Sequence, residues 1–313
     1  MIDRRTLRFE HELLAGLEHS CFEARGASDG PRLSLIAGIH GCEYSSIAAV
    51  IRFMNELDTS ELSGTITAVP VVSLDSFRAR SPFVVPQDGR NLNRCFPGSL
   101  DGSHADVLAR SIFDELIAPA DALVDLHGGD LVEGLEPFAL YDESEVEDRA
   151  RALAVAFGLP YVVRQPAEGS AIAGTTSSAA AAVGVPAIIA EAGGCGLVDE
   201  QAIGLLTRGV GNVLRELGML PGDPDPPRAP IQSVARFVWL RSTGEGWWDA
   251  AVKAGDEVES ASVVGVVRNL YGDVLEEIRA PEEGVILFIT TSPAVAAEGL
   301  LLGLGCELTK IAG

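Results

Sequence analysis

Hydrophobic residues follow two alternating patterns along the first 220 positions of the chain. Short apolar runs at 33–36, 64–72, 121–129 and 186–194 predict buried strands, and the last two end in glycine turns. Apolar residues with helical spacing separate these runs, for example at Ile47, Val50, Ile51 and Met54, and again near 103–116, 144–157 and 201–217. This alternation predicts an α/β fold, a mixed sheet with helices on both faces.

The pattern changes after the stretch 221–230, which is rich in proline and reads as a linker. Beyond it, short β-type runs at 235–240, 250–252, 263–267 and 285–290 are separated by glycine or acidic turns, and no helical pattern is seen. We therefore predict two domains, a catalytic domain at 1–225 and a small, all-β, barrel-like C-terminal domain at 231–313.

Composition narrows the class of protein. The 313 residues are 47% hydrophobic and 22% charged, as in globular proteins, and no apolar run is long enough to cross a bilayer. No signal-peptide core follows residues 1–5, so we expect a cytoplasmic protein without a membrane partner. The formal net charge of −22 argues against a nucleic-acid partner. Salt screens this charge beyond about 10 Å, so a locally cationic pocket can still accept an anionic substrate.

The five cysteines are odd in number and show no paired spacing. This favours reduced thiols in a reducing compartment. Free cysteine often packs as a small hydrophobic residue, and we expect that role here.

Chemically active residues recur where predicted strands end. Three of the apolar strands are followed by a potential ligand or base and then by glycine, at His40, His127 and Glu191. A fourth strand leads into an irregular polar stretch, 73–101, which contains the motif Q-D-G-R-N-L-N-R-C-F-P-G at 87–98. Long irregular loops of this kind are usually functional. Ligands of open α/β sheets collect at the carboxyl ends of strands, so we expect these features to meet at one edge.

His40 and Glu43 lie three residues apart where a strand becomes a helix. An imidazole nitrogen and a carboxylate oxygen placed in this way can converge on one first-row metal ion, most often zinc. An isolated H-x-x-E pair is usually an ordinary surface pair, so the prediction depends on the other strand ends.

Taken together, these motifs resemble the succinylglutamate desuccinylase/aspartoacylase family of the zinc-carboxypeptidase superfamily. The likeness covers roughly residues 30–220, in the same order, and the β-rich tail resembles the C-terminal domain of that family, a barrel similar to lipoyl carriers. The tail has no lysine at a plausible hairpin tip, which argues against a carrier role. The motifs that carry the resemblance are His40-x-x-Glu43, N-L-N-R-x-F-P-G with Asn93 and Arg94, D-L-H-G-G at 125–129, and A-E-A-G-G around Glu191.

The resemblance implies a role for each motif. His40, Glu43 and His127 would bind one Zn²⁺ per chain and leave a fourth position for water, whose pKa falls toward about 7. Glu191 would act as general base and then as general acid. Asp125 shares a strand face with His127 and can orient its imidazole.

Arg94, helped by Asn93, would hold a substrate carboxylate through its planar fork of donors. An arginine in the preceding loop would stabilise the oxyanion. Here the sequence departs from the aspartoacylase pattern, because Pro86 lies eight residues before Arg94. We assign the role to Arg80, and Arg78 is the alternative.

The predicted function is a zinc-dependent amidohydrolase. It would remove an N-acyl group from an acylated amino acid or a related small amine that bears a carboxylate. Bacterial relatives of this kind include deacetylases of N-acetylated diaminobutyrate. A metallocarboxypeptidase uses the same ligands and is the close alternative, and a non-catalytic zinc-binding protein is a more distant one. The resemblance also makes a homo-oligomer plausible. Four residues of the tail can be considered for the pocket, although core or surface positions are their commoner roles: Arg241, Trp247, Trp248 and Tyr271.

Overall fold

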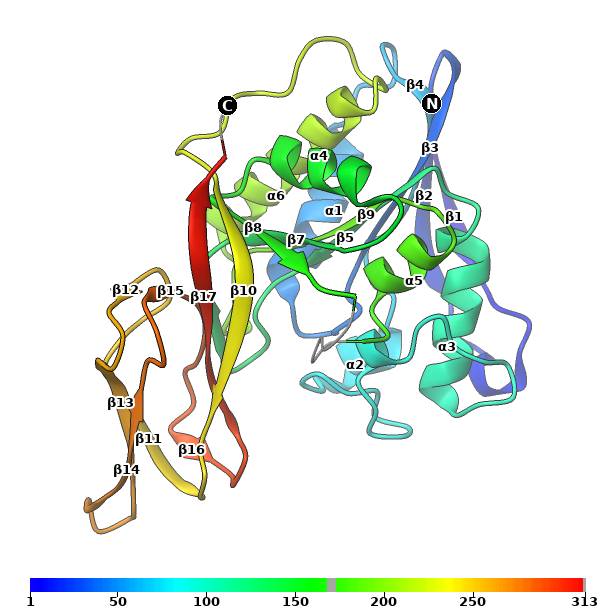
Figure 1. The fold of residues 1–313 in the computed structure, drawn as a ribbon. Helices are drawn as coiled ribbons and strands as arrows, with labels where there is room; N and C mark the ends of the chain where they lie inside the picture. Colours follow the sequence, from blue (N-terminus) through cyan, green and yellow to red (C-terminus); the bar gives the residue numbers. More distant parts are fainter. Residues whose placement is uncertain (168–172, 312–313) are drawn as a thin grey trace.

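The computed structural model describes residues 1–167 and 173–311. Its largest element is a 13-stranded mixed sheet (Figure 1). Strand β6 (Glu133–Leu135) pairs with β15 outside the main path. The other strands, in order across the sheet, are β1 (Ile2–Leu7), β2 (His19–Arg25), β4 (Ser63–Val69), β3 (Ser28–Ala37), β5 (Ala122–His127), β9 (Ala187–Glu191), β7 (Phe138–Asp142), β8 (Tyr161–Gln165), β10 (Gln232–Arg241), β17 (Leu300–Lys310), β15 (Gly284–Thr290) and β12 (Glu257–Val258).

Helices cover both faces of the central parallel strands, as predicted. Helices α1 (Tyr44–Glu56), α4 (Glu147–Phe157) and α6 (Glu200–Glu216) share one core with Leu33 and Leu35 of β3. On the other face, Ile36 of the same strand packs with α3 (His104–Ile112), the π-helical turn Phe113–Ile117 and α5 (Thr176–Ala182). Because both faces are buried, β3 ends in an unbroken apolar run rather than an alternating one.

Close packing of α6 on α4 gives a testable consequence. A Cβ added at Gly209 of α6 would lie 2.2 Å from the Phe157 ring, whereas one added at Gly204, which is exposed in the same helix, meets nothing within 4 Å. We expect Gly209→Ala to lower the free energy of unfolding by about 1–3 kcal/mol through overpacking. Gly204→Ala, the matched control, should raise it by about 0.4–1 kcal/mol. Urea unfolding of both variants measures the difference, and equal effects would contradict the packing.

The stretch 73–101 is less irregular than the sequence indicates. It contains the short helix α2 (Leu74–Ala79) and a 3-10 turn at Leu92–Arg94, and another 3-10 turn lies near the N-terminus at Glu12–Leu14. The side chain of Asn91 accepts a hydrogen bond from the backbone nitrogen of Asn93 and so begins the second of these turns. Elements of three to six residues are too short to show a hydrophobic period, which is why the sequence pattern misses them.

The sheet continues without a break into the C-terminal part. Strand β10 pairs in parallel with β8 through Gln232 opposite Tyr161 and in antiparallel with β17. A second, four-stranded sheet consists of β14 (Val274–Arg279), β13 (Val263–Arg268), β11 (Gly246–Ala250) and β16 (Ala294–Val295). Between residues 231 and 311 the structure has no helix, as predicted. The division into domains 1–225 and 231–313 stays a prediction.

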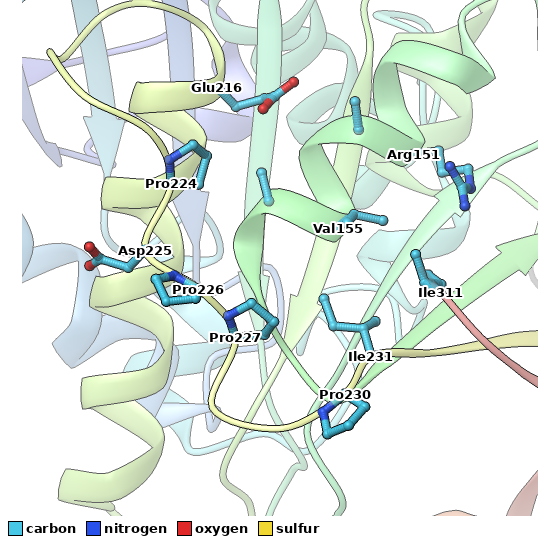
Figure 2. Close-up of a pocket in the computed structure, with 12 residues that line it drawn as sticks. Arg151, Val155, Glu216, Pro224, Asp225, Pro226, Pro227, Pro230, Ile231 and Ile311 are labelled. Carbon is cyan, nitrogen blue, oxygen red and sulfur yellow. The ribbon is translucent and has the colours of Figure 1, made fainter. Parts of the chain in front are cut away.

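The proline-rich connection between the two parts follows the outside of α4 and α6 (Figure 2). Asn212 of α6 ties it down, since its side chain donates to Asp225 O at 3.1 Å and accepts from Asp225 N at 2.8 Å. A cleft of about 630 Å³ lies beneath it, lined by Val155, Pro226, Ile311 and others. Within the part of the chain that the structure describes, no helix is long and apolar enough to cross a membrane.

Candidate metal centre and active site

A tight glycine turn brings His40 and Glu43 to the carboxyl end of β3. Gly38 has a φ of +64°, and a Cβ at Gly41 would lie 2.1 Å from Phe77 N, so both positions favour glycine. Glu43 is the N-cap residue of α1, and its Oε1 lies 2.6 Å from His40 Nδ1. The strand-turn-helix junction predicted from the sequence therefore places an imidazole nitrogen beside a carboxylate.

His127 joins this pair from the end of β5, the strand next to β3. Its Nδ1 lies 3.0 Å from Glu43 Oε2, and its ring centroid lies 5.2 Å from that of His40. One potential ligand atom from each of the three residues falls within 4.8 Å of the others, and Glu43 and His127 are buried. The structure thus brings together the three predicted metal ligands.

The outer nitrogen of each imidazole is held by an oxygen acceptor. His40 Nε2 lies 3.0 Å from Asn91 Oδ1, and His127 Nε2 lies 3.0 Å from Asp125 Oδ2. Asp125 is fully buried and also accepts from Thr176 Oγ1 at 2.6 Å. In the neutral imidazole, an oxygen at Nε2 favours a proton there, so Nδ1 is the nitrogen left to bind a metal. Without a metal, burial lowers the pKa of His127, but the charges of Asp125 and Glu43 outweigh it and raise that pKa well above its ordinary value. Two imidazole nitrogens and a carboxylate are a donor set that fits zinc.

Glu191 ends β9 in register with His127 on β5, so the two side chains neighbour each other at the sheet edge. It lines the same cavity as His40 and His127. Burial raises the pKa of the Glu191 carboxyl to about 8, and the imidazoles of His127 and His40 act in the opposite direction. The predicted base therefore lies beside the three predicted metal ligands His40, Glu43 and His127, called the metal-ligand cluster below.

The cavity has a volume of about 730 Å³, and His127 and Glu191, which end β5 and β9, are among the residues that line it. Arg94 and Asn93 line it, and their role in substrate binding stays a prediction. Arg94 donates to Asn93 O at 2.7 Å, and Asn93 Oδ1 accepts from Thr176 N at 3.0 Å. Asn93 is therefore held in place by the start of α5, which leaves its Nδ2 as the donor available to a ligand.

The two arginines considered for the oxyanion lie elsewhere. Arg80 is exposed at the C-terminal end of α2, with a φ of 53°, and Arg78 is paired with Asp75 at 4.0 Å. Neither belongs to the described residues that line the cavity. The assignment of Arg80 stays a prediction.

Several residues at the site escape sequence analysis. Asn91 stands in the N-L-N-R motif, which offers a signal, whereas Thr176 has none. The segment 235–239 of β10 forms one wall of the cavity. None of the tail residues considered earlier is among the described residues that line the cavity. Trp248 is buried in the core of the C-terminal part, and Tyr271 is 95% exposed.

A second buried carboxyl follows His127 in the chain. Glu133 Oε2 accepts from Asp130 N at 2.9 Å, and Asp130 Oδ2 accepts from Phe83 N at 2.7 Å. Burial raises the pKa of Glu133 to about 8, with the charges of Glu43 and Asp130 adding to the effect. These contacts tie the loop after β5 to the loop after α2.

Glu133 should make the stability of the protein depend on pH. Between about 4.3, the value of an unfolded glutamate, and about 8, the native state keeps a proton that the unfolded state has lost. The free energy of unfolding therefore falls as pH rises through this window. Glu133→Gln keeps the neutral shape, so its melting temperature relative to wild type should rise from about pH 5 to about pH 9. Thermal unfolding in matched buffers tests this, and a pH-independent difference would contradict it.

The cysteines match the expectation for packing residues. All five are free, and four of them, Cys21, Cys42, Cys95 and Cys306, are buried. The metal-capable cluster found among residues 1–167 and 173–311 contains no cysteine.

Comparisons with known proteins find a curated relative and solved structures that are similar to this chain. Curated N-alpha-acetyl-L-2,4-diaminobutyric acid deacetylase from Halomonas elongata is 30% identical over 267 residues, which cover 82% of this chain and 77% of the relative. Two solved structures share the fold, each at 23% identity. The product-bound ectoine utilization protein EutE (DoeB) from Ruegeria pomeroyi has a TM-score of 0.86 and covers 97% of this chain and 95% of its own. The succinylglutamate desuccinylase/aspartoacylase from Rhodobacter sphaeroides has a TM-score of 0.84 and covers 100% and 96%.

Residues 29–217 match the family described as the succinylglutamate desuccinylase/aspartoacylase catalytic domain. The match spans more than half of the chain and includes the metal-ligand cluster, Arg94 and Glu191. The chain therefore belongs to the succinylglutamate desuccinylase/aspartoacylase family.

Proposed function

We propose that this protein is a zinc-dependent amidohydrolase that removes an N-acyl group from an acylated amino acid or a related small amine. The observation that carries the proposal is the clustering of His40, Glu43 and His127 at a cavity that His40 and His127 line together with Glu191 and Arg94. The family is one of deacylases, and the curated relative is named as a deacetylase of an N-acyl amino acid, which supports the same class of reaction.

Zinc would be held by His40, Glu43 and His127, with Asn91 and Asp125 fixing the two imidazoles. When bound, it would supply a Lewis acid that lowers the pKa of a water to about 7. Both imidazoles direct Nδ1 toward Glu43, so binding of zinc would displace protons from these nitrogens but would need little rearrangement of the chain.

Glu191 would take a proton from the attacking water and return it to the departing nitrogen. The water oxygen bonds to the acyl carbon as the C–N bond breaks, which yields a carboxylate and a free amine. In the absence of a cation the pKa of Glu191 is about 8, and a positive charge at the neighbouring ligands would lower it, because opposite charge stabilises the carboxylate. Glu191 would then be ionised at neutral pH, as a base must be.

Arg94 would bind the substrate carboxylate, and Asn93 Nδ2 would add a donor beside it. A guanidinium fork binds a carboxylate through two parallel hydrogen bonds, which fixes orientation as well as charge. Arg80 remains our proposal for the oxyanion, which requires that its loop move toward the cavity when substrate binds. A cytoplasmic location and a homo-oligomer also stay predictions.

Asp125 should increase the affinity for zinc although it is not one of the predicted metal ligands. Asp125→Asn removes an acceptor that holds His127 Nε2 and can present a donor there instead, which favours the wrong tautomer. We expect zinc affinity to fall about 10- to 100-fold. Competition with a chromophoric chelator measures it. The control is Asp121→Asn, an exposed carboxyl paired with Arg32, which should leave the affinity unchanged.

The reaction class can be tested directly with purified protein loaded with zinc. We expect release of free amine from N-acyl amino acids and no cleavage of short peptides that end in a free carboxylate. Cleavage of the peptides alone would point to a metallocarboxypeptidase. Turnover of neither set, with one zinc bound, would favour a non-catalytic zinc-binding protein.

A further inference from the structure

The cavity that holds Glu191 and Arg94 also has a continuous apolar floor. Phe138 and Leu140 of β7, Val163 of β8 and Ile189 of β9 line it, and all four are buried in one cluster. Leu140 stands in register with both Val163 and Ile189. Neighbouring strands thus present a single apolar surface next to the reacting groups.

Strand β10 extends this surface with two aromatic rings. Phe237 and Trp239 line the cavity, and their ring centroids lie 4.6 Å apart. Phe237 also faces Phe138 at 6.1 Å, and Trp239 meets Phe288 edge-on at 5.5 Å. Both rings remain partly exposed, so each keeps apolar surface that a ligand can cover. Covering apolar area is favourable by about 25 cal/mol per Å².

Among the described residues that line the cavity, one arginine is available to bind an anionic group of a ligand. Arg164 is paired with Glu143 at 3.0 Å and Glu147 at 2.9 Å. Arg236 is paired in the same way with Glu282 and Glu307.

Arg94 differs, because its side chain donates to the backbone carbonyl of Asn93, so its charge is available to a carboxylate. Among the described residues that line the cavity, Glu191 is the only one with an acidic side chain. If Glu191 acts as the base, these lining residues offer no second carboxylate that could pair with a cationic group on the substrate.

We infer that the substrate carries, besides the carboxylate held by Arg94, an apolar group of the size of a branched aliphatic or aromatic side chain that packs on Phe237 and Trp239. This inference rests on the proposed deacylase function and narrows its substrate class. It departs from the diaminobutyrate derivative in the name of the Halomonas relative, whose side chain ends in an amine. The apolar group can belong to the amino acid or to the acyl chain, and the two cases can be separated.

Binding should be measured by calorimetry on zinc-loaded Glu191→Gln protein, which prevents turnover. One arm varies the amine side with N-acetyl-L-phenylalanine, N-acetyl-L-leucine, N-acetylglycine and N-α-acetyl-L-2,4-diaminobutyrate. The other arm varies the acyl side with N-benzoylglycine and N-acetylglycine. We expect an apolar compound in at least one arm to bind about 10-fold or more tightly than N-acetylglycine. Tightest binding of the diaminobutyrate compound, or no apolar preference in either arm, would overturn the inference.

Substitutions in β10 test whether the aromatic wall causes the preference. Trp239→Ala and Phe237→Ala should each reduce the apolar preference about 10-fold and leave binding of N-acetylglycine nearly unchanged. Trp239→Phe should keep most of it.

Trp247→Ala is the matched control, since Trp247 is 49% exposed on β11 and does not line the cavity. Equal weakening of every compound by Trp239→Ala and Phe237→Ala would show that the wall has no role in selection. Failure of the proposed function gives a different result, because the wild-type zinc-loaded protein would hydrolyse none of the compounds whatever their order of binding.

Discussion

Glu191→Gln should lower kcat for N-acyl amino acid hydrolysis by about 10²- to 10⁴-fold, because the site loses the group that moves the proton. Glutamine has the same shape but cannot accept and return a proton. Because Glu191 is outside the predicted ligand set, zinc should still bind at one ion per chain. Steady-state kinetics with metal analysis of the same sample measures both. An unchanged kcat would refute the assignment of Glu191 as the base.

Glu133→Gln is the matched control for this experiment. Glu133 is also a buried glutamate with a pKa of about 8, and it follows His127 by six positions in the chain, but it does not line the cavity. The amide oxygen of glutamine can still accept from Asp130 N. The variant should keep kcat near the wild-type value, so a large loss in Glu191→Gln alone would report on proton transfer and not on the removal of a buried charge.

His127→Gln should abolish both zinc retention and hydrolysis. His127 supplies one of only three predicted ligand side chains, and its Nδ1 faces Glu43 at 3.0 Å. Loss of a hydrogen-bond partner of a ligand costs about 10- to 100-fold in metal affinity, and loss of the ligand itself should cost more. Metal analysis after dialysis and an activity assay measure the effect. His11→Gln changes the histidine that caps the 3-10 turn Glu12–Leu14 and that does not belong to the group of potential metal ligands, so this variant should retain both properties.

The sequence predicts the metal-ligand cluster well because the carboxyl ends of neighbouring parallel strands lie at the same edge of a sheet. Strands β3, β5 and β9 are consecutive in the sheet and parallel, so the residues that end them must meet. Each of these strands has a largely apolar stretch and is followed within two residues by glycine, a pattern that is easily seen. The convergence of His40, His127 and Glu191 therefore follows from strand ends alone.

The long C-terminal strand β17 is harder to predict. Gly303 and Gly305 interrupt its apolar run, and glycine is disfavoured in strands. The structure supplies the reason for both. A Cβ at Gly303 would lie 2.3 Å from the Phe237 ring, and one at Gly305 would lie 2.8 Å from a methyl of Leu287. Tertiary packing thus overrides local propensity.

The aromatic wall of the cavity could not be found from sequence either. Phe237 and Trp239 reach the site only because β10 adds to β8 in parallel, although the two strands are separated by α5, β9, α6 and the proline-rich connection. No periodicity within β10 indicates this pairing, and residues of the same type at Trp247 and Trp248 lie elsewhere. Substrate selection is therefore the part of the site that depends most on long-range contacts.

Zinc K-edge X-ray absorption on protein reconstituted with one equivalent of Zn²⁺ tests the central claim most directly. We predict a first shell with two imidazole nitrogens at about 2.0–2.1 Å, carboxylate or water oxygen at a similar distance, and no sulfur at about 2.3 Å. His127→Gln should remove one imidazole from that shell or prevent loading. A shell that contains sulfur, or a spectrum that does not change in His127→Gln, would contradict the account.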